Sequence, residues 1–446
     1  MNKKIGFVSL GCAKNLTDTE TMLGILSEDG FEITADVTEA DVIVVNTCAF
    51  IDSAKEEAIN TILEMAQYKE HNCSLLVVTG CLAQRYPDDI KAELGEVDII
   101  LGTTDYDKIS SVIKDYYAQG VKNSYVGDCN TPVSYDLPRI KTTAPYTAYL
   151  KIADGCDNYC TYCIIPKLRG KYKSRPEESI LSEARELALS GVKELILIAQ
   201  DTAYYGKDRG EYAIAPLLRE LSAIEGIEWI RMQYCYPEHI TDELVEDIAT
   251  NPKVVKYIDM PLQHISDEVL RRMGRRSRRK DVEELIEKLR TKVPGIVIRT
   301  SLIVGFPGET EEDFGILKTF LENYPLDRVG VFSYSCEEGT PAATFEDQID
   351  EDVKTERRNI VMELLQRVSA QLNRSKIGTV TEAIVEGYDE ENFCYVGRTA
   401  QDTPEVDGTA YIYSEYELEA GDIVTIKIVD ADEYDLTGEV TDEFTK

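Results

Sequence analysis

The sequence lacks any apolar run of about 18 residues, the length that a membrane-spanning helix requires. Its start, from Met1 to Leu10, leads directly into a strand-like pattern and has no long apolar segment or small-residue cleavage site of a signal peptide. We therefore expect a cytoplasmic protein with no membrane partner. Histidine is also scarce, and the three scattered histidines predict no catalytic triad.

Basic residues are few: 48 Lys and Arg stand against 82 Asp and Glu, for a formal net charge of −34. This balance argues against broad, non-specific nucleic-acid binding, because affinity for phosphate backbones comes chiefly from Lys and Arg. An acidic surface suits a basic partner, although solubility alone explains the charge equally well. With 446 residues, 43% of them apolar, the chain predicts two or three domains with real cores.

Cysteine, by contrast, is abundant. Eleven cysteines make an odd number, which fits poorly with a fully paired disulfide framework. In a reducing cytoplasm, clustered cysteines more often indicate metal or redox chemistry. Six of them form two groups of three, one defined by its spacing and one by its positions after predicted strands. The other five lack the spacing of cluster ligands and are interpreted as packing residues.

The pattern of apolar runs predicts an α/β protein in three parts. In residues 1–130, strand-like runs alternate with helical patterns, which is typical of an open domain with a parallel sheet. Residues 131–145 are interpreted as a linker. In residues 146–374, six strand candidates separated by helical patterns predict a partial (β/α)6 barrel. Alternating apolar residues in 375–446 predict a small all-β domain.

The strongest motif is a C-x3-C-x2-C group just after the first strand of the predicted barrel: Cys156, Cys160 and Cys163. Cysteine thiolates are the usual ligands of iron–sulfur clusters, and three of them leave the fourth iron of a 4Fe–4S cluster open. The alternatives are a zinc site or three incidental buried cysteines. Structural zinc sites usually have four protein ligands, so we favour the cluster.

A second group lies in the first domain, where Cys12, Cys48 and Cys81 each follow a predicted strand. The carboxyl ends of parallel strands share one edge of a sheet, so these three side chains are expected to converge. Two of them follow a glycine, which allows a bulky ligand to approach the backbone closely. The alternative is three small buried apolar residues, a common role of free cysteine.

The C-x3-C-x2-C spacing resembles that of the radical S-adenosylmethionine (SAM) superfamily. This resemblance implies that the open iron binds SAM, which is then cleaved to a 5′-deoxyadenosyl radical. Gln200 and Asp201 end the second barrel strand and resemble the superfamily motif that binds the amino group of SAM. Gly305 and Gly308 end the fifth strand, where the superfamily often packs glycines against the adenine. A turn with positive φ explains Gly308 equally well.

Taken over nearly the whole chain, the three domains resemble the methylthiotransferase family. The resemblance implies an auxiliary 4Fe–4S cluster on the three N-terminal cysteines, a radical SAM cluster on the C-x3-C-x2-C group, and a C-terminal TRAM domain. Four segments resemble the RimO branch in particular: Gly11–Leu16, Asn46–Lys55, Ile198–Thr202 and Pro404–Gly408.

What the RimO resemblance implies is a transferase that adds a methylthio group to the β-carbon of an aspartate. The substrate would be small-subunit ribosomal protein number twelve, with two SAM consumed per turnover and an electron donor of flavodoxin or ferredoxin type. From Lys376 onward the chain holds 19 acidic and 4 basic residues, a formal net charge of −15. Ribosomal proteins are basic, so this charge is complementary to such a partner.

Two alternatives stay open at this point. The first is a MiaB-like tRNA adenosine methylthiotransferase, which the acidic tail disfavours because a tRNA-binding domain needs cations for phosphates. The second is a non-catalytic iron–sulfur scaffold. One segment, Arg271–Lys280, has seven basic residues in ten and could contact RNA or protein. We favour a solvated helix end or a segment that pairs with the acidic surface of the same chain.

Overall fold

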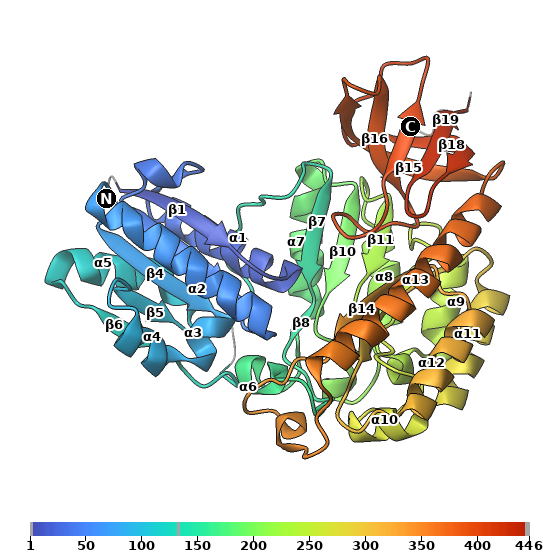
Figure 1. The fold of residues 1–446 in the computed structure, drawn as a ribbon. Helices are drawn as coiled ribbons and strands as arrows, with labels where there is room; N and C mark the ends of the chain where they lie inside the picture. The colour runs from blue at the N-terminus through green and yellow to red at the C-terminus, as the bar shows by residue number, and fades with distance from the viewer. Residues whose placement is uncertain (1–2, 132–133, 442–446) are drawn as a thin grey trace.

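The computed structural model describes residues 3–131 and 134–441, which form three units in chain order (Figure 1). The first unit is a six-stranded sheet in the order β2-β1-β3-β4-β5-β6, and every pairing in it is parallel. Its strands are β1 (Lys4–Ser9), β2 (Glu32–Thr34), β3 (Val42–Thr47), β4 (Leu75–Gly80), β5 (Ile99–Leu101) and β6 (Asn123–Tyr125).

Helices cover both faces of this sheet, so its central strands are apolar on both sides. All six residues of β3 and all six of β4 are buried, as expected for the middle of a covered parallel sheet. The helices are α1 (Ala13–Glu28), α2 (Asp52–Ala66), α3 (Cys81–Arg85), α4 (Pro87–Glu93) and α5 (Ile109–Gln119). The predicted open α/β domain is confirmed.

The middle unit is a partial barrel made of two three-stranded parallel sheets, β11-β10-β7 and β12-β13-β14. Its strands are β7 (Thr147–Lys151), β10 (Glu194–Ile198), β11 (Trp229–Met232), β12 (Tyr257–Asp259), β13 (Val297–Val304) and β14 (Arg328–Ser333). They coincide to within two residues at each end with the strands that the apolar runs predict, 148–152, 195–199, 229–234, 257–260, 296–303 and 329–334. A short antiparallel pair, β8 (Ala153–Asp154) and β9 (Lys173–Ser174), follows β7.

The barrel helices are α6 (Ile165–Arg169), α7 (Glu177–Leu189), α8 (Ile214–Ser222), α9 (Asp242–Thr250), α10 (Asp267–Arg272), α11 (Arg279–Lys292), α12 (Glu311–Asn323) and α13 (Glu351–Ser375). Most of them pack against one side of these strands, whereas Leu168 of α6 packs in the core of the first domain and Val269 of α10 packs beside Cys160. Side chains alternate along the strands, so Ala148 and Leu150 of β7 join the helix-covered core. Tyr149 points to the other side, where it packs with Ala13 and Leu16 of α1. The first helix of the N-terminal domain therefore closes this side of the barrel.

The last unit is a closed five-stranded barrel in the order β15-β16-β17-β19-β18, as the alternating pattern predicted. Its strands are β15 (Val380–Asp389), β16 (Cys394–Thr399), β17 (Ala410–Tyr413), β18 (Ile423–Ala431) and β19 (Leu436–Val440). Helix α13 leads into it, and it lies at the end of the large barrel away from α6 and α10 (Figure 1).

Buried polar contacts join this small barrel to the large one. Glu194 of β10 is fully buried and accepts hydrogen bonds from Arg231 (2.9 Å) and from Arg398 of β16. The segment between β16 and β17 adds Asp402, which pairs with Arg328 at 2.7 Å. Further contacts across the same interface are Gln233 to Thr403, Tyr257 to Asp407, and Trp229, the only tryptophan, to Glu382.

The predicted linker, 131–145, contains no helix or strand among its described residues, 131 and 134–145. Part of it is nevertheless held in place by ion pairs. Arg139 donates hydrogen bonds to Glu20 of α1 and to Glu183 of α7 and so joins the first domain to the barrel. No helix in the described ranges has both the length and the apolar character that crossing a membrane would demand.

Two helical glycines give a matched test of this packing. A methyl group at Gly24 of α1 would collide with the carbonyl of Pro138 and lie 2.6 Å from the amide nitrogen of Arg139, whereas one at Gly315 of α12 would meet nothing within 4 Å. We expect Gly24→Ala to lower the free energy of unfolding by about 1–3 kcal/mol, because backbone cannot move aside easily. Gly315→Ala should raise it by about 0.5–1 kcal/mol. Urea denaturation measures both, and equal effects would contradict the close approach.

Candidate functional site

The N-terminal cysteines lie at one edge of the first sheet. Cys12 caps the start of α1 after β1, Cys48 follows β3, and Cys81 begins α3 directly after β4. Because β1, β3 and β4 are neighbours in the sheet, their carboxyl ends adjoin. Gly11 has a φ of +89°, and a side chain there would lie 2.7 Å from the Cβ of Cys48. The backbone before Cys12 therefore runs directly against Cys48.

Asn15 connects the three strand ends. Its amide nitrogen donates to the carbonyl of Leu10 (3.1 Å) and to that of Thr47 (2.9 Å), the residue before Cys48. Its amide oxygen lies 3.9 Å from the sulfur of Cys81. Asn15 is fully buried, so this arrangement is part of the core. The predicted convergence of the three cysteines agrees with these contacts.

The second group occupies the loop between β8 and α6. The Cys156 amide donates to Gly170 (3.1 Å), and the Cys163 amide donates to Cys160 (3.0 Å), which folds the motif into a compact loop. The sulfur of Cys160 lies 3.7 Å from the hydroxyl of Tyr236 and 4.0 Å from the guanidinium of Arg275.

The chemistry of both groups fits iron–sulfur ligation. Burial raises the pKa of the Cys81 and Cys156 thiols to about 12, so each holds its proton at neutral pH until a metal ion displaces it. At Cys48, Cys156 and Cys163, neighbouring backbone amides partly oppose this effect of burial on the thiol pKa. Across residues 3–131 and 134–441, no three His, Cys, Asp or Glu side chains could together hold one metal ion. A 4Fe–4S cluster makes a different demand, because each thiolate binds a separate iron.

A buried charge network joins the two cysteine groups, and we call it the junction. Its centre is Arg169, at the end of α6, which donates to Asn15 (2.6 Å), Asp18 (2.7 Å) and Asp154 (3.2 Å). Its guanidinium also lies 3.9 Å from the sulfur of Cys81. Arg169 thus contacts Cys81 of the first group directly, and it reaches the second group through Asp154, which stands two residues before Cys156. No spacing pattern in the sequence indicates this arginine.

Gln200 and Asp201, the residues predicted to bind SAM, lie beside the Cys156 loop. Gln200 donates to Asp154 (2.9 Å), and its amide oxygen is buried without a hydrogen-bond partner. Such an oxygen is an open acceptor for an ammonium group. Asp201 accepts from Asn158 (3.0 Å) and lies 2.6 Å from the ring nitrogen of His239. The contacts of Asn158 and His239 with Asp201 were not predicted from the sequence. Asp201 also lines a small cavity of about 10 Å³.

The two predicted glycines follow β13, and both have positive φ. The space that a side chain on Gly305 would occupy is filled by Lys354 of α13, and that at Gly308 by Asp347 and Arg272. Turn geometry and close packing therefore explain both glycines without a ligand. Contact with an adenine stays a prediction.

Models of three known families match the chain in the same order as the three units. They are the uncharacterized protein family UPF0004 over residues 4–102, the radical SAM superfamily over 150–321, and the TRAM domain over 377–441. A ribosomal protein uS12 methylthiotransferase RimO from Acetivibrio thermocellus is 51% identical over 453 residues, which covers 100% of both chains. The chain belongs to the RimO family. It is a transferase of the radical SAM superfamily, whose cofactors are SAM and an iron–sulfur cluster.

Other relatives agree with this membership. RimO proteins from Clostridium botulinum and Trichlorobacter lovleyi are 52% and 50% identical, each over 99% of both chains. Among solved structures, the radical SAM methyltransferase TsrM from Kitasatospora setae has a TM-score of 0.55 at 15% identity, with 77% of each chain covered. The cobalamin-dependent SAM radical enzyme OxsB has a TM-score of 0.51 at 12% identity, covering 81% of this chain and 56% of that one. At these identities the two structures support the fold alone.

The basic segment of this RimO-family chain, Arg271–Lys280, is largely satisfied from within. Arg272 pairs with Asp347 at 2.6 Å, and Arg275 is buried under Tyr236, with its guanidinium 4.1 Å from the ring. The other ion pairs are Arg271 with Glu268, Arg279 with Glu283, and Lys280 with Glu284. The interpretation as a helix end with partners inside the chain agrees with these contacts.

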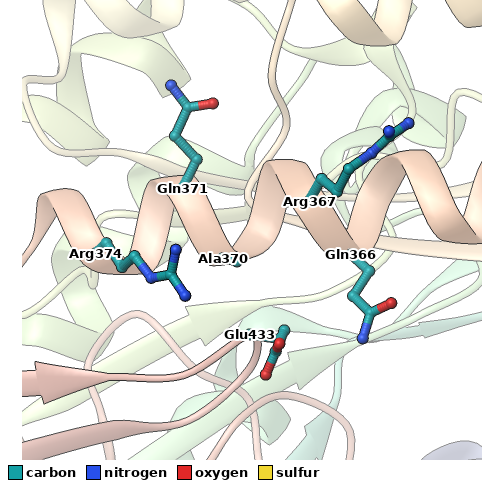
Figure 2. A pocket seen from close by; sticks show the side chains of 6 residues that line it. All are labelled: Gln366, Arg367, Ala370, Gln371, Arg374 and Glu433. Atoms are coloured by element: carbon teal, nitrogen blue, oxygen red, sulfur yellow. The ribbon is translucent and has the colours of Figure 1, made fainter.

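A wider surface hollow of about 510 Å³ lies away from the cysteines, between α13 and Glu433 in the turn after β18. Figure 2 shows that Arg374 and Gln366 approach Glu433, whereas Arg367 and Gln371 point to the opposite side of the helix. The side chains do not converge on a common point, so we assign no site to this hollow.

His264 follows β12 and is fully buried, and its Nδ1 accepts the amide hydrogen of Ser266 at 3.0 Å. Burial lowers its pKa from 6.5 to about 4, so it stays neutral in the folded chain. Below pH 6.5 the imidazole of His264 takes up a proton in the unfolded chain but not in the folded chain. The free energy of unfolding therefore decreases as the pH falls from 6.5 towards 4.

We expect acidification from pH 7 to pH 5 to destabilise the parent protein by roughly 2 kcal/mol more than His264→Asn. Asparagine can accept the same amide hydrogen but has no such titration. The measurement is the free energy of unfolding in urea at both pH values, under anaerobic conditions. Parallel pH profiles for the two proteins would show that His264 titrates normally.

Proposed function

We propose that this chain adds a methylthio group to the β-carbon of an aspartate in ribosomal protein uS12, using two SAM per turnover. The observation that carries the proposal is a sequence identity of 51%, over essentially the full length of the chain, with proteins named as uS12 methylthiotransferases. The geometry supports it, since two groups of three cysteines on different domains meet at one junction. A substrate of this kind would put the reaction in the cytoplasm.

Two 4Fe–4S clusters are part of the proposal. Cys12, Cys48 and Cys81 would hold the auxiliary cluster, and the C-x3-C-x2-C group would hold the radical SAM cluster. When bound, the clusters and SAM would supply an electron, a 5′-deoxyadenosyl radical and a sulfur carrier, which acid–base side chains cannot provide for an unactivated C–H bond.

The chain itself orients and encloses these groups. Arg169 fixes the distance between the two cysteine groups through its bonds to Asn15 and Asp154. The unpaired amide oxygen of Gln200 would accept from the SAM amino group, with Asp201 holding the neighbouring loop in place. Gly305 and Gly308 would border the adenine. The task of these residues is to position the target carbon within reach of both sites.

The proposed partners follow from charge. A C-terminal domain of net charge −15 would repel tRNA phosphates and attract a basic ribosomal protein. A flavodoxin- or ferredoxin-type protein would deliver the electrons. We further propose 1–130, 131–145, 146–374 and 375–446 as the N-terminal domain, linker, radical SAM domain and TRAM domain.

The proposal is tested on anaerobically reconstituted protein. Iron and sulfide are counted, SAM, dithionite and purified uS12 are added, and the mass of uS12 is followed. About eight irons and a gain of one methylthio group on an aspartate are expected. Eight irons with deoxyadenosine release but unmodified uS12 would redirect the search to tRNA. About four irons would remove Cys12, Cys48 and Cys81 as a cluster site.

A further inference from the structure

Lys14 is a buried cation for which the described residues provide no carboxylate. It lies in the first turn of α1, two residues after Cys12, and only 8% of it is exposed. Its ammonium donates one long hydrogen bond, to the carbonyl of Ala199 (3.4 Å), and lies 3.5 Å from the ring centre of Tyr234. Across residues 3–131 and 134–441, it forms no ion pair. Buried charges are normally paired, so a partner is expected from outside the chain.

The two carboxylates of the junction are already in use. Asp18 pairs with both Lys151 and Arg169, and Asp154 pairs with Arg169 at 3.2 Å and accepts from Gln200 at 2.9 Å. Two carboxylates thus neutralise Lys151 and Arg169. The positive charge of Lys14 is left over in the junction.

Lys14 also lies beside the proposed SAM site, where the substrate has to bind. Ala199, its carbonyl partner, ends the strand that leads into Gln200 and Asp201, and Tyr234 follows β11 at the same end of the barrel. The neighbours of Lys14 in the helix, Ala13 and Leu16, pack against Tyr149 inside the barrel. The ammonium therefore lies between the Cys12 site and the barrel interior.

We propose that Lys14 binds the side-chain carboxylate of the target aspartate, an assignment that rests on the proposed function. An ammonium has three N–H donors, and only one is used here. The carboxylate carbon of aspartate is bonded directly to the β-carbon. An ion pair with Lys14 would fix the carboxylate carbon, and the reacting β-carbon, one bond away, would then be held beside the sulfur-carrying site. Lys14 is on this basis a specificity-determining residue that selects aspartate over its neutral isostere.

The test compares uS12 carrying the target aspartate, located by mass spectrometry, with uS12 in which that residue is changed to asparagine. Dissociation constants are measured for the reconstituted parent, Lys14→Met and Lys14→Arg. Charge-assisted hydrogen bonds predict that the parent prefers aspartate by about 10- to 100-fold. Lys14→Met should lose this preference through weaker binding of the aspartate form alone, and Lys14→Arg should keep most of it.

Lys167→Met is the matched control, because Lys167 also donates to a carbonyl, that of Gly339, but is exposed and outside the junction. It should change neither constant. Iron content and SAM affinity of Lys14→Met should equal those of the parent. Loss of iron would mean that Lys14 only balances the charge of the Cys12 site, and weaker SAM binding with an unchanged aspartate preference would mean that it holds the SAM carboxylate. Either result overturns the assignment. If the parent leaves uS12 unmodified, the proposed function itself fails.

Discussion

Replacing Cys12, Cys48 and Cys81 together with alanine is expected to abolish methylthio transfer while SAM cleavage continues. The three cysteines belong to the first sheet, and the C-x3-C-x2-C loop belongs to the barrel, so each group can be removed with the other intact. Iron should fall from about eight to about four per chain. Deoxyadenosine release should persist, because the barrel site is unchanged, and no modified uS12 should form.

The complementary variant changes Cys156, Cys160 and Cys163 to alanine and should abolish both deoxyadenosine release and product. Cys73→Ala is the control: Cys73 is 3% exposed in the same domain as the N-terminal group, but its sulfur donates to the carbonyl of Leu75. Its iron content should match that of the parent. Full methylthio transfer by the N-terminal triple variant would show that those three cysteines carry no sulfur chemistry.

The second large effect is expected at Glu194, where the small C-terminal barrel meets the large one. Glu194→Ala would leave the buried guanidinium of Arg231 without a counter-charge and would leave Arg398 with Glu386 alone. Removing one partner of a buried pair costs about 3–5 kcal/mol, and two terminal nitrogens of Arg231 already lack partners. The midpoint of thermal unfolding should fall by roughly 6–20 °C.

A second variant separates the charge effect from the loss of packing. Changing Glu194, Arg231 and Arg398 together to leucine or methionine should recover much of the stability, because the uncompensated charges are gone. Glu268→Ala removes an exposed ion pair with Arg271 and should leave the midpoint unchanged. If Glu194→Ala and Glu268→Ala behaved alike in a thermal scan, the buried network would contribute nothing to stability.

Much of this architecture could be predicted from local patterns. Apolar runs located the central strands of both α/β units, because those strands are buried on both faces and need a continuous run of apolar residues. The short edge strands β2 (Glu-Ile-Thr) and β6 (Asn-Ser-Tyr) were missed, since each has three residues and no such run. The convergence of Cys12, Cys48 and Cys81 followed from the geometry of parallel sheets, and the other three cysteines were found from their spacing alone.

The contacts between domains could not be predicted in this way. Arg169 is 154 residues from Asn15 and 151 from Asp18 in the chain, and nothing in the residues around it indicates those partners. The ion pair between Asp402 and Arg328 could not be predicted either, because an ion pair leaves no periodic pattern in the sequence. Lys14 lies in the motif Gly11–Leu16, but its lack of a counter-charge among the described residues is a property of the folded chain alone.

The only tryptophan of the chain gives the interface between the two barrels a natural optical reporter. Trp229 is 3% exposed, and its indole N–H donates to Glu382 of the C-terminal barrel at 3.3 Å. Its emission therefore comes from one place and one environment. Separation of the two barrels would expose the indole to water and shift that emission to longer wavelength, without any dye or added label. The fluorescence of the unmodified protein thus follows the docking of its last domain in real time.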